Sequence, residues 1–160
     1  MTAYVALGSN LGDRRAALDS AVSALRGLDG VEVRAVSRAV ETPPVGPPGQ
    51  GPYLNAAARL RTKLGPHVLL AATQAIELSL GRPPREHREH WGPRVIDLDL
   101  LLHGDAVIDD DRLALPHPRM HEREFVLVPL CEVGPDACHP VLGRTAAELL
   151  AELTHAEAVS

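Results

Sequence analysis

The chain has 160 residues, a formal net charge of −5 and 45% hydrophobic residues, values that fit one globular domain spanning residues 1–160. The negative charge argues against nucleic-acid binding through a basic surface, and the longest apolar run is too short to cross a membrane. We therefore expect neither a nucleic acid nor a membrane as a partner. The first residues lack the basic stretch and apolar core of a signal peptide, and two cysteines are too few for a disulfide framework, so we expect a cytoplasmic protein.

The N-terminal half alternates predicted strands with predicted helices. Strands are expected over residues 3–8, 31–40 and 54–62. Asp13 can cap a helix that stops near Gly27 or Gly30. A second helix is expected to begin at Pro66 and to end at Gly81.

Two irregular segments and several further elements complete the chain. Residues 42–52 contain five prolines and three glycines and can form neither a helix nor a central strand, and residues 82–94 are rich in charge. The remaining elements are expected to be a strand, a hairpin and two helices, over residues 95–103, 105–115, 122–133 and 145–153. This order suits a ferredoxin-like α+β sandwich, in which an antiparallel sheet carries helices on one face, with extra C-terminal elements.

A pair of carboxylates lies within the predicted strand 95–103. Side chains alternate along a strand, so Asp97 and Asp99 share one face, with their Cα atoms ~6.6 Å apart. Two like charges at this spacing repel unless a cation joins them, and hard oxygen ligands suit Mg²⁺. The alternative is a strand that merely has a solvated polar face.

The segment before this strand is rich in arginine. Four of the 15 arginines lie in residues 82–94, and guanidinium groups bind phosphate oxygens in a bidentate manner. Trp91, one of only four aromatic residues, can stack on a ring. Glu86 and Glu89 reduce the positive charge, so a solvated surface loop is the alternative.

Five separated motifs occur in one order along the chain. They are LGSNLG (residues 7–12), ETPP (41–44), YLNAA (53–57), WGPRVIDLD (91–99), and PH (116–117) followed by REFVLVPL (123–130). Together they resemble the 6-hydroxymethyl-7,8-dihydropterin pyrophosphokinase family of folate biosynthesis. The resemblance extends from about residue 3 to residue 135 and so covers most of the chain.

The resemblance implies that the chain is a Mg²⁺-dependent diphosphokinase. Such an enzyme transfers the pyrophosphoryl group of ATP to the hydroxymethyl oxygen of the pterin and releases AMP. Asp97 and Asp99 are implied to hold two Mg²⁺ ions, with Arg82 and Arg94 beside the transferred group. Further contacts to ATP are implied for Gln74, Glu77, Arg88, Trp91, Arg112, His117 and Arg123. The implied pterin pocket consists of Thr42, Pro43, Val45, Tyr53, Asn55 and Phe125. The rings of Tyr53 and Phe125 would lie on either side of the pterin. We also expect the enzyme to be a monomer.

One departure from the family pattern lies in residues 82–94. Many relatives carry an arginine immediately before the tryptophan, where this chain has His90. Arg85 and Arg88 are both candidates for the missing contact to ATP, and we favour Arg88 because it is closer to Trp91.

Two other functions are compatible with the same residues. A different Mg²⁺ enzyme, such as a nucleotide phosphohydrolase, would use Asp97 and Asp99 without any pterin. A non-catalytic ferredoxin-like protein would bind a nucleotide through the arginine-rich segment without turnover. The products formed from ATP, with and without the pterin, distinguish the three functions.

Overall fold

The computed structural model describes residues 1–10, 12–43, 52–81 and 95–159, and its centre is an antiparallel sheet. The strands of this sheet are β1 (Thr2–Ser9), β2 (Val31–Val36), β3 (Val40–Thr42), β4 (Tyr53–Thr62) and β5 (Asp97–His103). Their order is β2-β4-β1-β5, and β3 also pairs with β4. Every pair is antiparallel, with β1 and β4 in the middle. This arrangement confirms the predicted ferredoxin-like sandwich.

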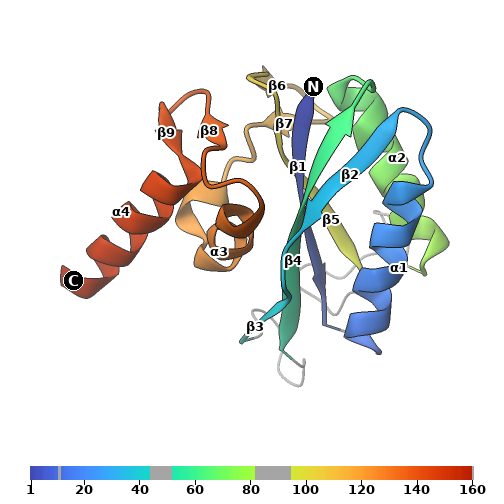
Figure 1. Cartoon of the computed structure of the whole chain (residues 1–160), viewed down its shortest axis with the longest axis horizontal. Helices are drawn as coiled ribbons and strands as arrows, with labels where there is room; N and C mark the ends of the chain where they lie inside the picture. Colours follow the sequence, from blue (N-terminus) through green and yellow to red (C-terminus); the bar gives the residue numbers. More distant parts are fainter. Residues whose placement is uncertain (11, 44–51, 82–94, 160) are drawn as a thin grey trace.

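Helices α1 (Arg14–Arg26) and α2 (Pro66–Ser79) cover one face of the sheet (Figure 1). As the sequence indicates, Asp13 caps α1, because its Oδ1 accepts the N–H of Ala16 at 3.0 Å. Leu18 and Leu25 of α1 are buried together with Val5 and Leu7 of β1. The first core of the protein therefore lies between these two helices and the sheet.

The C-terminal elements, including the two helices expected after residue 121, cover the opposite face, whereas the predicted sandwich had helices on one face only. A short 3-10 helix (Met120–Glu122) leads into α3 (Glu124–Val133), and Leu127 and Leu130 of α3 pack with Ala57 of β4 in a second core cluster. Helix α4 (Ala146–Val159) packs against α3 on the side away from the sheet (Figure 1). Two hairpins complete the fold: β6 (Ile108–Asp109) with β7 (Ala114–Leu115), and β8 (Cys138–His139) with β9 (Arg144–Thr145).

Several element boundaries differ from the prediction. The expected strand over residues 31–40 is divided into β2 and β3 at Ser37, whose Oγ accepts the N–H of Ala57 at 2.9 Å. The expected helix over residues 122–133 begins at Glu124, because the preceding turn is a 3-10 helix. The last helix extends to Val159, and the hairpin of β8 and β9 was not predicted.

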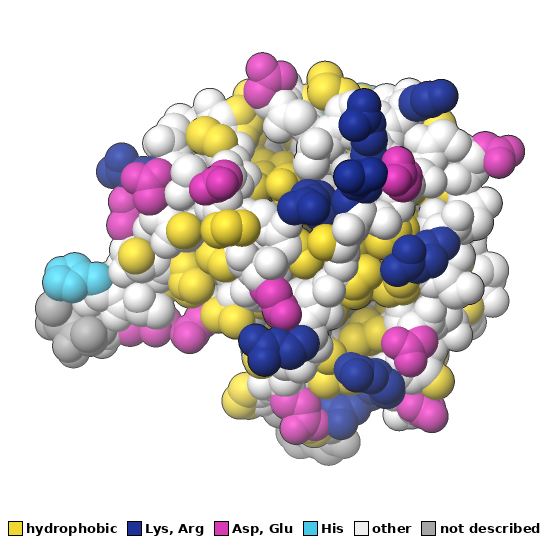
Figure 2. Space-filling model, viewed as in Figure 1, with side chains coloured by type: hydrophobic (Ala, Val, Ile, Leu, Met, Phe, Trp, Pro, Cys, Tyr) yellow, Lys and Arg dark blue, Asp and Glu magenta, His cyan; other side chains and the backbone are white. Residues whose placement is uncertain are grey.

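The surface carries charges of both signs. Figure 2 shows basic and acidic side chains interspersed on the face that is viewed as in Figure 1, with hydrophobic side chains between them. In the described part of the chain, no helix has both the length and the apolar character that a membrane crossing requires.

Candidate active site

A row of residues crosses the sheet at the end of β1 and joins several predicted site residues. The register pairs Gly8 of β1 with Asn55 of β4 on one side and with Asp97 of β5 on the other. Paired residues of neighbouring strands project to the same face. Asn55 and Asp97 therefore lie on one face, and because Ala57 on the same face packs against α3, this is the face covered by the C-terminal elements.

Gly8 has no side chain to separate Asn55 from Asp97. A Cβ at this position would lie 3.4 Å from Oδ1 of Asn55 and 3.7 Å from Cδ1 of Tyr53. Gly8 is the last residue of the expected strand 3–8, and β1 continues one residue further, to Ser9. A glycine inside a strand marks a close approach, and this signal could have identified Gly8 as part of the site.

The two carboxylates of β5 are half-buried and face the same side of the sheet. Between them, the N–H of Leu98 donates to Oε2 of Glu77 at 2.8 Å. Glu77 is buried, at 3% exposure, whereas Gln74 on the same helix is exposed. Both residues were expected to contact ATP, but Gln74 is exposed and Glu77 is buried. Glu77 contacts the backbone that carries Asp97 and Asp99.

His117 lies beside this pair. Its backbone N–H donates to the carbonyl of Leu101 at 2.9 Å, which holds it against β5. Burial and the nearby charge of Arg123 lower the pKa of His117 to about 4, although the negative charge of Asp97 acts in the opposite direction. The ring is therefore neutral at pH 7. Its Nδ1 accepts the N–H of Arg119 at 3.2 Å, so the proton of the neutral ring is on Nε2, which can donate to a ligand.

The start of α3 contributes a cation and an aromatic ring. Arg123 directly precedes α3, and its guanidinium carbon lies 5.7 Å from the ring centroid of Phe125. Phe125 is 36% exposed, so part of its ring is accessible to a ligand. The charges of Asp97 and Arg123 both act on His117, so these three residues lie near one another.

The amide of Asn55 is oriented by β3. Its Nδ2 donates to Oγ1 of Thr42 at 2.8 Å and, at 3.5 Å, to the carbonyl of Val40. Tyr53 is half-buried at the start of β4 and pairs with Thr42 across the hairpin, while Pro43 is exposed. Thr42, Tyr53 and Asn55 are therefore brought together, as expected for a pocket that recognises a flat heterocycle.

Other predicted site residues are not in this group. Val45, Arg82, Arg88, Trp91 and Arg94 lie outside the described residues. Arg112 is exposed in the turn between β6 and β7, where its backbone N–H donates to Asp110 at 2.9 Å. Their roles stay predictions.

The residues present fit hard divalent cations that are shared with phosphate groups. Within the described ranges, no group of three or more His, Cys, Asp or Glu side chains could hold a metal ion by itself. Asp97 and Asp99 supply oxygen ligands on one face of a strand, and Mg²⁺ is commonly held by one or two carboxylates with phosphate oxygens and water. This donor set suits Mg²⁺ carried with a polyphosphate better than a permanently bound metal.

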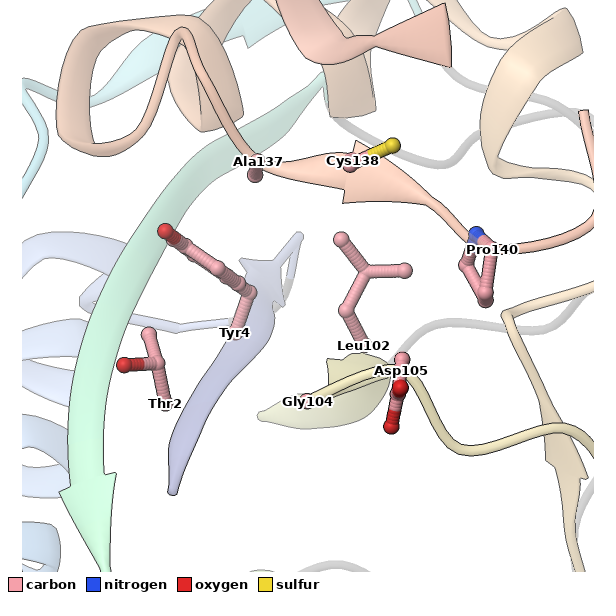
Figure 3. Close-up of a pocket in the computed structure, with 8 residues that line it drawn as sticks. All are labelled: Thr2, Tyr4, Leu102, Gly104, Asp105, Ala137, Cys138 and Pro140. Atoms are coloured by element: carbon pink, nitrogen blue, oxygen red, sulfur yellow. The ribbon is translucent and has the colours of Figure 1, made fainter. Parts of the chain in front are cut away.

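A separate pocket of about 300 Å³ lies between the start of β1, the end of β5 and β8 (Figure 3). Tyr4, Leu102 and Cys138 are among its lining residues. It lies at the Tyr4 end of β1, four residues from Gly8, and its described lining includes none of the predicted site residues.

Known proteins resemble this chain over most of its length. A 2-amino-4-hydroxy-6-hydroxymethyldihydropteridine pyrophosphokinase from Methylorubrum extorquens is 48% identical over 151 residues, which cover 94% of this chain and 92% of the relative. The protein of the same name from Bacillus subtilis is 50% identical over 131 residues, with coverage of 82% and 77%.

Solved structures share the fold. A crystal structure of HPPK-DHPS in complex with substrates has a TM-score of 0.73 at 11% identity and covers 98% of this chain. Plasmodium falciparum HPPK-DHPS with pteroate has a TM-score of 0.71 at 15% identity. This chain spans 44% and 42% of those two chains. Residues 4–135 match the family described as 7,8-dihydro-6-hydroxymethylpterin-pyrophosphokinase (HPPK). With a family match over most of its length and relatives near 50% identity, the chain belongs to the HPPK family.

Proposed function

We propose that the protein transfers the pyrophosphoryl group of ATP to 6-hydroxymethyl-7,8-dihydropterin in folate biosynthesis and releases AMP. The bond that forms joins the hydroxymethyl oxygen to the β-phosphorus, and the bond that breaks links the β-phosphorus to the bridging oxygen of AMP. The observation that carries this proposal is the row Asn55, Gly8 and Asp97. It puts an amide suited to a heterocycle and a carboxylate suited to metal-bound phosphates on one face, with only a glycine between them.

The pterin side of the site lies at the end of the β3–β4 hairpin where Thr42 pairs with Tyr53. The Nδ2 of Asn55 donates to Thr42 and Val40, so its Oδ1 is the atom proposed to accept an N–H group from the edge of the pterin ring. Tyr53 and the exposed ring of Phe125 supply aromatic surfaces for its two sides. Thr42, Pro43 and Val45 complete the proposed pocket.

The phosphate side lies along β5 and before α3. Asp97 and Asp99 would hold two Mg²⁺ ions, which supply charge neutralisation for the phosphate groups when bound. The neutral ring of His117 donates through Nε2, and Arg123 contributes a positive charge close by. Phosphoryl transfer depends mainly on positioning and charge stabilisation, which these side chains can provide.

Further ATP contacts complete the proposal. Gln74 and Arg112 are exposed and can reach a bound nucleotide, and Glu77 acts at least through the backbone of β5. Arg82, Arg94, Arg88 and Trp91 are proposed to contact the triphosphate and the nucleotide. We also propose a monomer that works in the cytoplasm, where ATP is available and where free thiols such as Cys131 and Cys138 persist.

One assay tests the activity. The purified protein is incubated with ATP and Mg²⁺, with and without 6-hydroxymethyl-7,8-dihydropterin, and AMP and ADP are measured. We expect one AMP for each pterin diphosphate and no AMP without the pterin. ADP as the main product, or equal turnover without the pterin, would contradict the proposal and favour a nucleotide phosphohydrolase.

A further inference from the structure

Arg14 makes two contacts that connect α1 to both strands of the β3–β4 hairpin. Its Nη1 donates to the carbonyl oxygen of Pro52 at 2.8 Å, and its Nη2 lies 2.6 Å from Oε1 of Glu41. The Arg14 side chain is 29% exposed and that of Glu41 is 56% exposed. We call this arrangement of Arg14, Glu41 and Pro52 the arginine bridge.

The arginine bridge lies next to the proposed pterin pocket. Glu41 belongs to β3 and pairs with Leu54, and Pro52 directly precedes β4. The next pair along the hairpin is Thr42 with Tyr53. Both strands are therefore held by one guanidinium group, one residue away from the side chains that orient and flank the proposed ring.

An arginine suits this role better than a lysine. The guanidinium group is planar and presents separate donors in a fixed geometry, so it can bind a carboxylate and a carbonyl at the same time. An ammonium group is a point charge on a flexible stem and does not fix both partners in one plane. Because exposed ion pairs contribute little to the stability of a whole fold, the effect of the bridge is expected to be local.

We propose that Arg14 is a positioning residue for the pterin pocket, an inference that rests on the proposed function. By joining Glu41 to the carbonyl of Pro52, it keeps Thr42 and Tyr53 in register at the end of the hairpin. Thr42 in turn accepts the hydrogen bond that orients the amide of Asn55. Loss of the bridge loosens the pocket on its β3 side and leaves β5, which carries the phosphate-binding carboxylates, unchanged.

Steady-state kinetics of Arg14→Ala test the proposal. We expect the KM for the pterin to rise roughly 3- to 10-fold, because disorder of a preorganised pocket lowers affinity. The KM for ATP and kcat should stay within about twofold. Arg15→Ala, an exposed arginine in the same turn of α1, is the matched control and should leave all three values unchanged. Arg14→Lys should restore less than the full pterin affinity, and Glu41→Gln should reproduce part of the Arg14→Ala effect.

Hydrogen exchange of the ligand-free protein provides a second readout that does not depend on activity. We expect faster exchange at residues 40–42 and 53–55 in Arg14→Ala than in wild type or Arg15→Ala, with unchanged exchange in β5. The proposal would be overturned if Arg14→Ala left the KM for the pterin unchanged. It would also be overturned if the KM values for the pterin and for ATP rose equally and hydrogen exchange increased throughout the sheet. If the wild type forms no AMP in response to the pterin, the proposed function is rejected. If hydrogen exchange at residues 40–42 and 53–55 is the same in Arg14→Ala as in the wild type, the role of the arginine bridge is rejected as well.

Discussion

Asn55 and Asp97 pair with the same glycine from opposite sides, so the amide and the carboxylate lie on one face of the sheet, two strand spacings apart. With strands spaced at 4.7–4.9 Å, this corresponds to about 10 Å between their Cα positions. In the proposed site, the pterin and the phosphate chain would lie side by side over Gly8, at a distance set by the backbone pairing of Asn55 and Asp97 with Gly8.

Gly8→Ala should impair use of the pterin. The new methyl group would lie 3.4 Å from Oδ1 of Asn55, in contact with the amide that is proposed to bind the pterin. We expect kcat/KM for the pterin to fall roughly 10- to 100-fold, since a small misplacement of reacting groups is costly. Nucleotide affinity, measured by titration calorimetry with an ATP analogue, should change by less than about twofold. Gly65→Ala, where a Cβ meets no atom within 4 Å, is the control, and an equal loss in both variants would argue against a role for Gly8.

Asp97→Ala and Asp99→Ala should nearly abolish turnover while the fold is kept. Each removes one of two carboxylates proposed to hold Mg²⁺, and each relieves repulsion between like charges, so stability should be unchanged or slightly higher. We expect kcat to fall by more than about tenfold, equivalent to over ~1.4 kcal/mol of barrier. Asp105→Ala removes an exposed carboxylate outside the site and should keep wild-type turnover. A variant of Asp97 or Asp99 that retains more than a tenth of kcat would show that the metal role is wrong.

Glu77→Ala should lower the stability of the fold, whereas Gln74→Ala should affect the KM for ATP and not the stability. Loss of the Glu77 carboxylate removes the partner of the buried Leu98 N–H, so the free energy of unfolding should fall by about 1–3 kcal/mol. Gln74 is exposed, and its replacement should leave stability within ±0.5 kcal/mol while raising the KM for ATP. Urea unfolding and ATP-dependent kinetics of both variants are the measurements. Equal stability of the two variants would contradict the assigned role of Glu77.

The C-terminal hairpin should lose stability in mild acid. Nδ1 of His139 accepts the N–H groups of Val141 and Leu142 at 3.3 and 3.0 Å, which requires this nitrogen to be unprotonated. Burial and the neighbouring ring of His121 lower the pKa of His139 below its ordinary value of 6.5. As the pH falls through 6.5, the unfolded chain binds a proton more readily than the folded protein does, so stability decreases. Glu122, which lies 3.9 Å from His121, and the cross-strand partner Arg144 are the other charged groups nearby.

Replacement of His139 should reduce this pH dependence. His139→Asn keeps an acceptor close to the position of Nδ1 but cannot be protonated, so its free energy of unfolding should decrease less between pH 7.5 and 5.5 than that of the wild type. His155→Asn, in the exposed part of α4, is the control and should follow the wild type. A pH dependence of His139→Asn that equals the wild type would contradict this assignment.

The sequence was sufficient to predict the elements that have regular patterns. These local signals are the capping residue Asp13, Pro66 at the first position of α2, and the residue patterns of β1, β4 and β5. The structure contains each element that they predicted. The two-residue strands of β8 and β9 are too short to show any alternation, so they were missed. The division between β2 and β3 depends on a hydrogen bond from Ala57 to Ser37, twenty residues apart, which no local pattern reveals.

The sequence names the residues of the candidate site but not the contacts between them. Asp97 and Asp99 are identified by strand alternation, and the family motifs lead to His117, Arg123 and Asn55. The register that places Gly8 between Asn55 and Asp97 is a property of three strands that are distant in sequence. The contacts of Arg14 span 27 residues to Glu41 and 38 to Pro52, and they exist only because α1 begins beside the end of the hairpin.

One face of the sheet forms the core under α1 and α2, and the other carries the proposed site. This difference limits where insertions and deletions can occur in the strands. In β1, Ala3, Val5 and Leu7 belong to the core under α1 and α2, whereas Gly8 belongs to the site face. A single-codon insertion within β1 or β5 would exchange these faces and place carboxylates in the core and leucines in the site. The fold should therefore tolerate insertions and deletions better in the connections between elements than in these strands. A gene library with one extra codon at each position tests this expectation. Insertions within β1 and β5 should most often give inactive, poorly folded proteins.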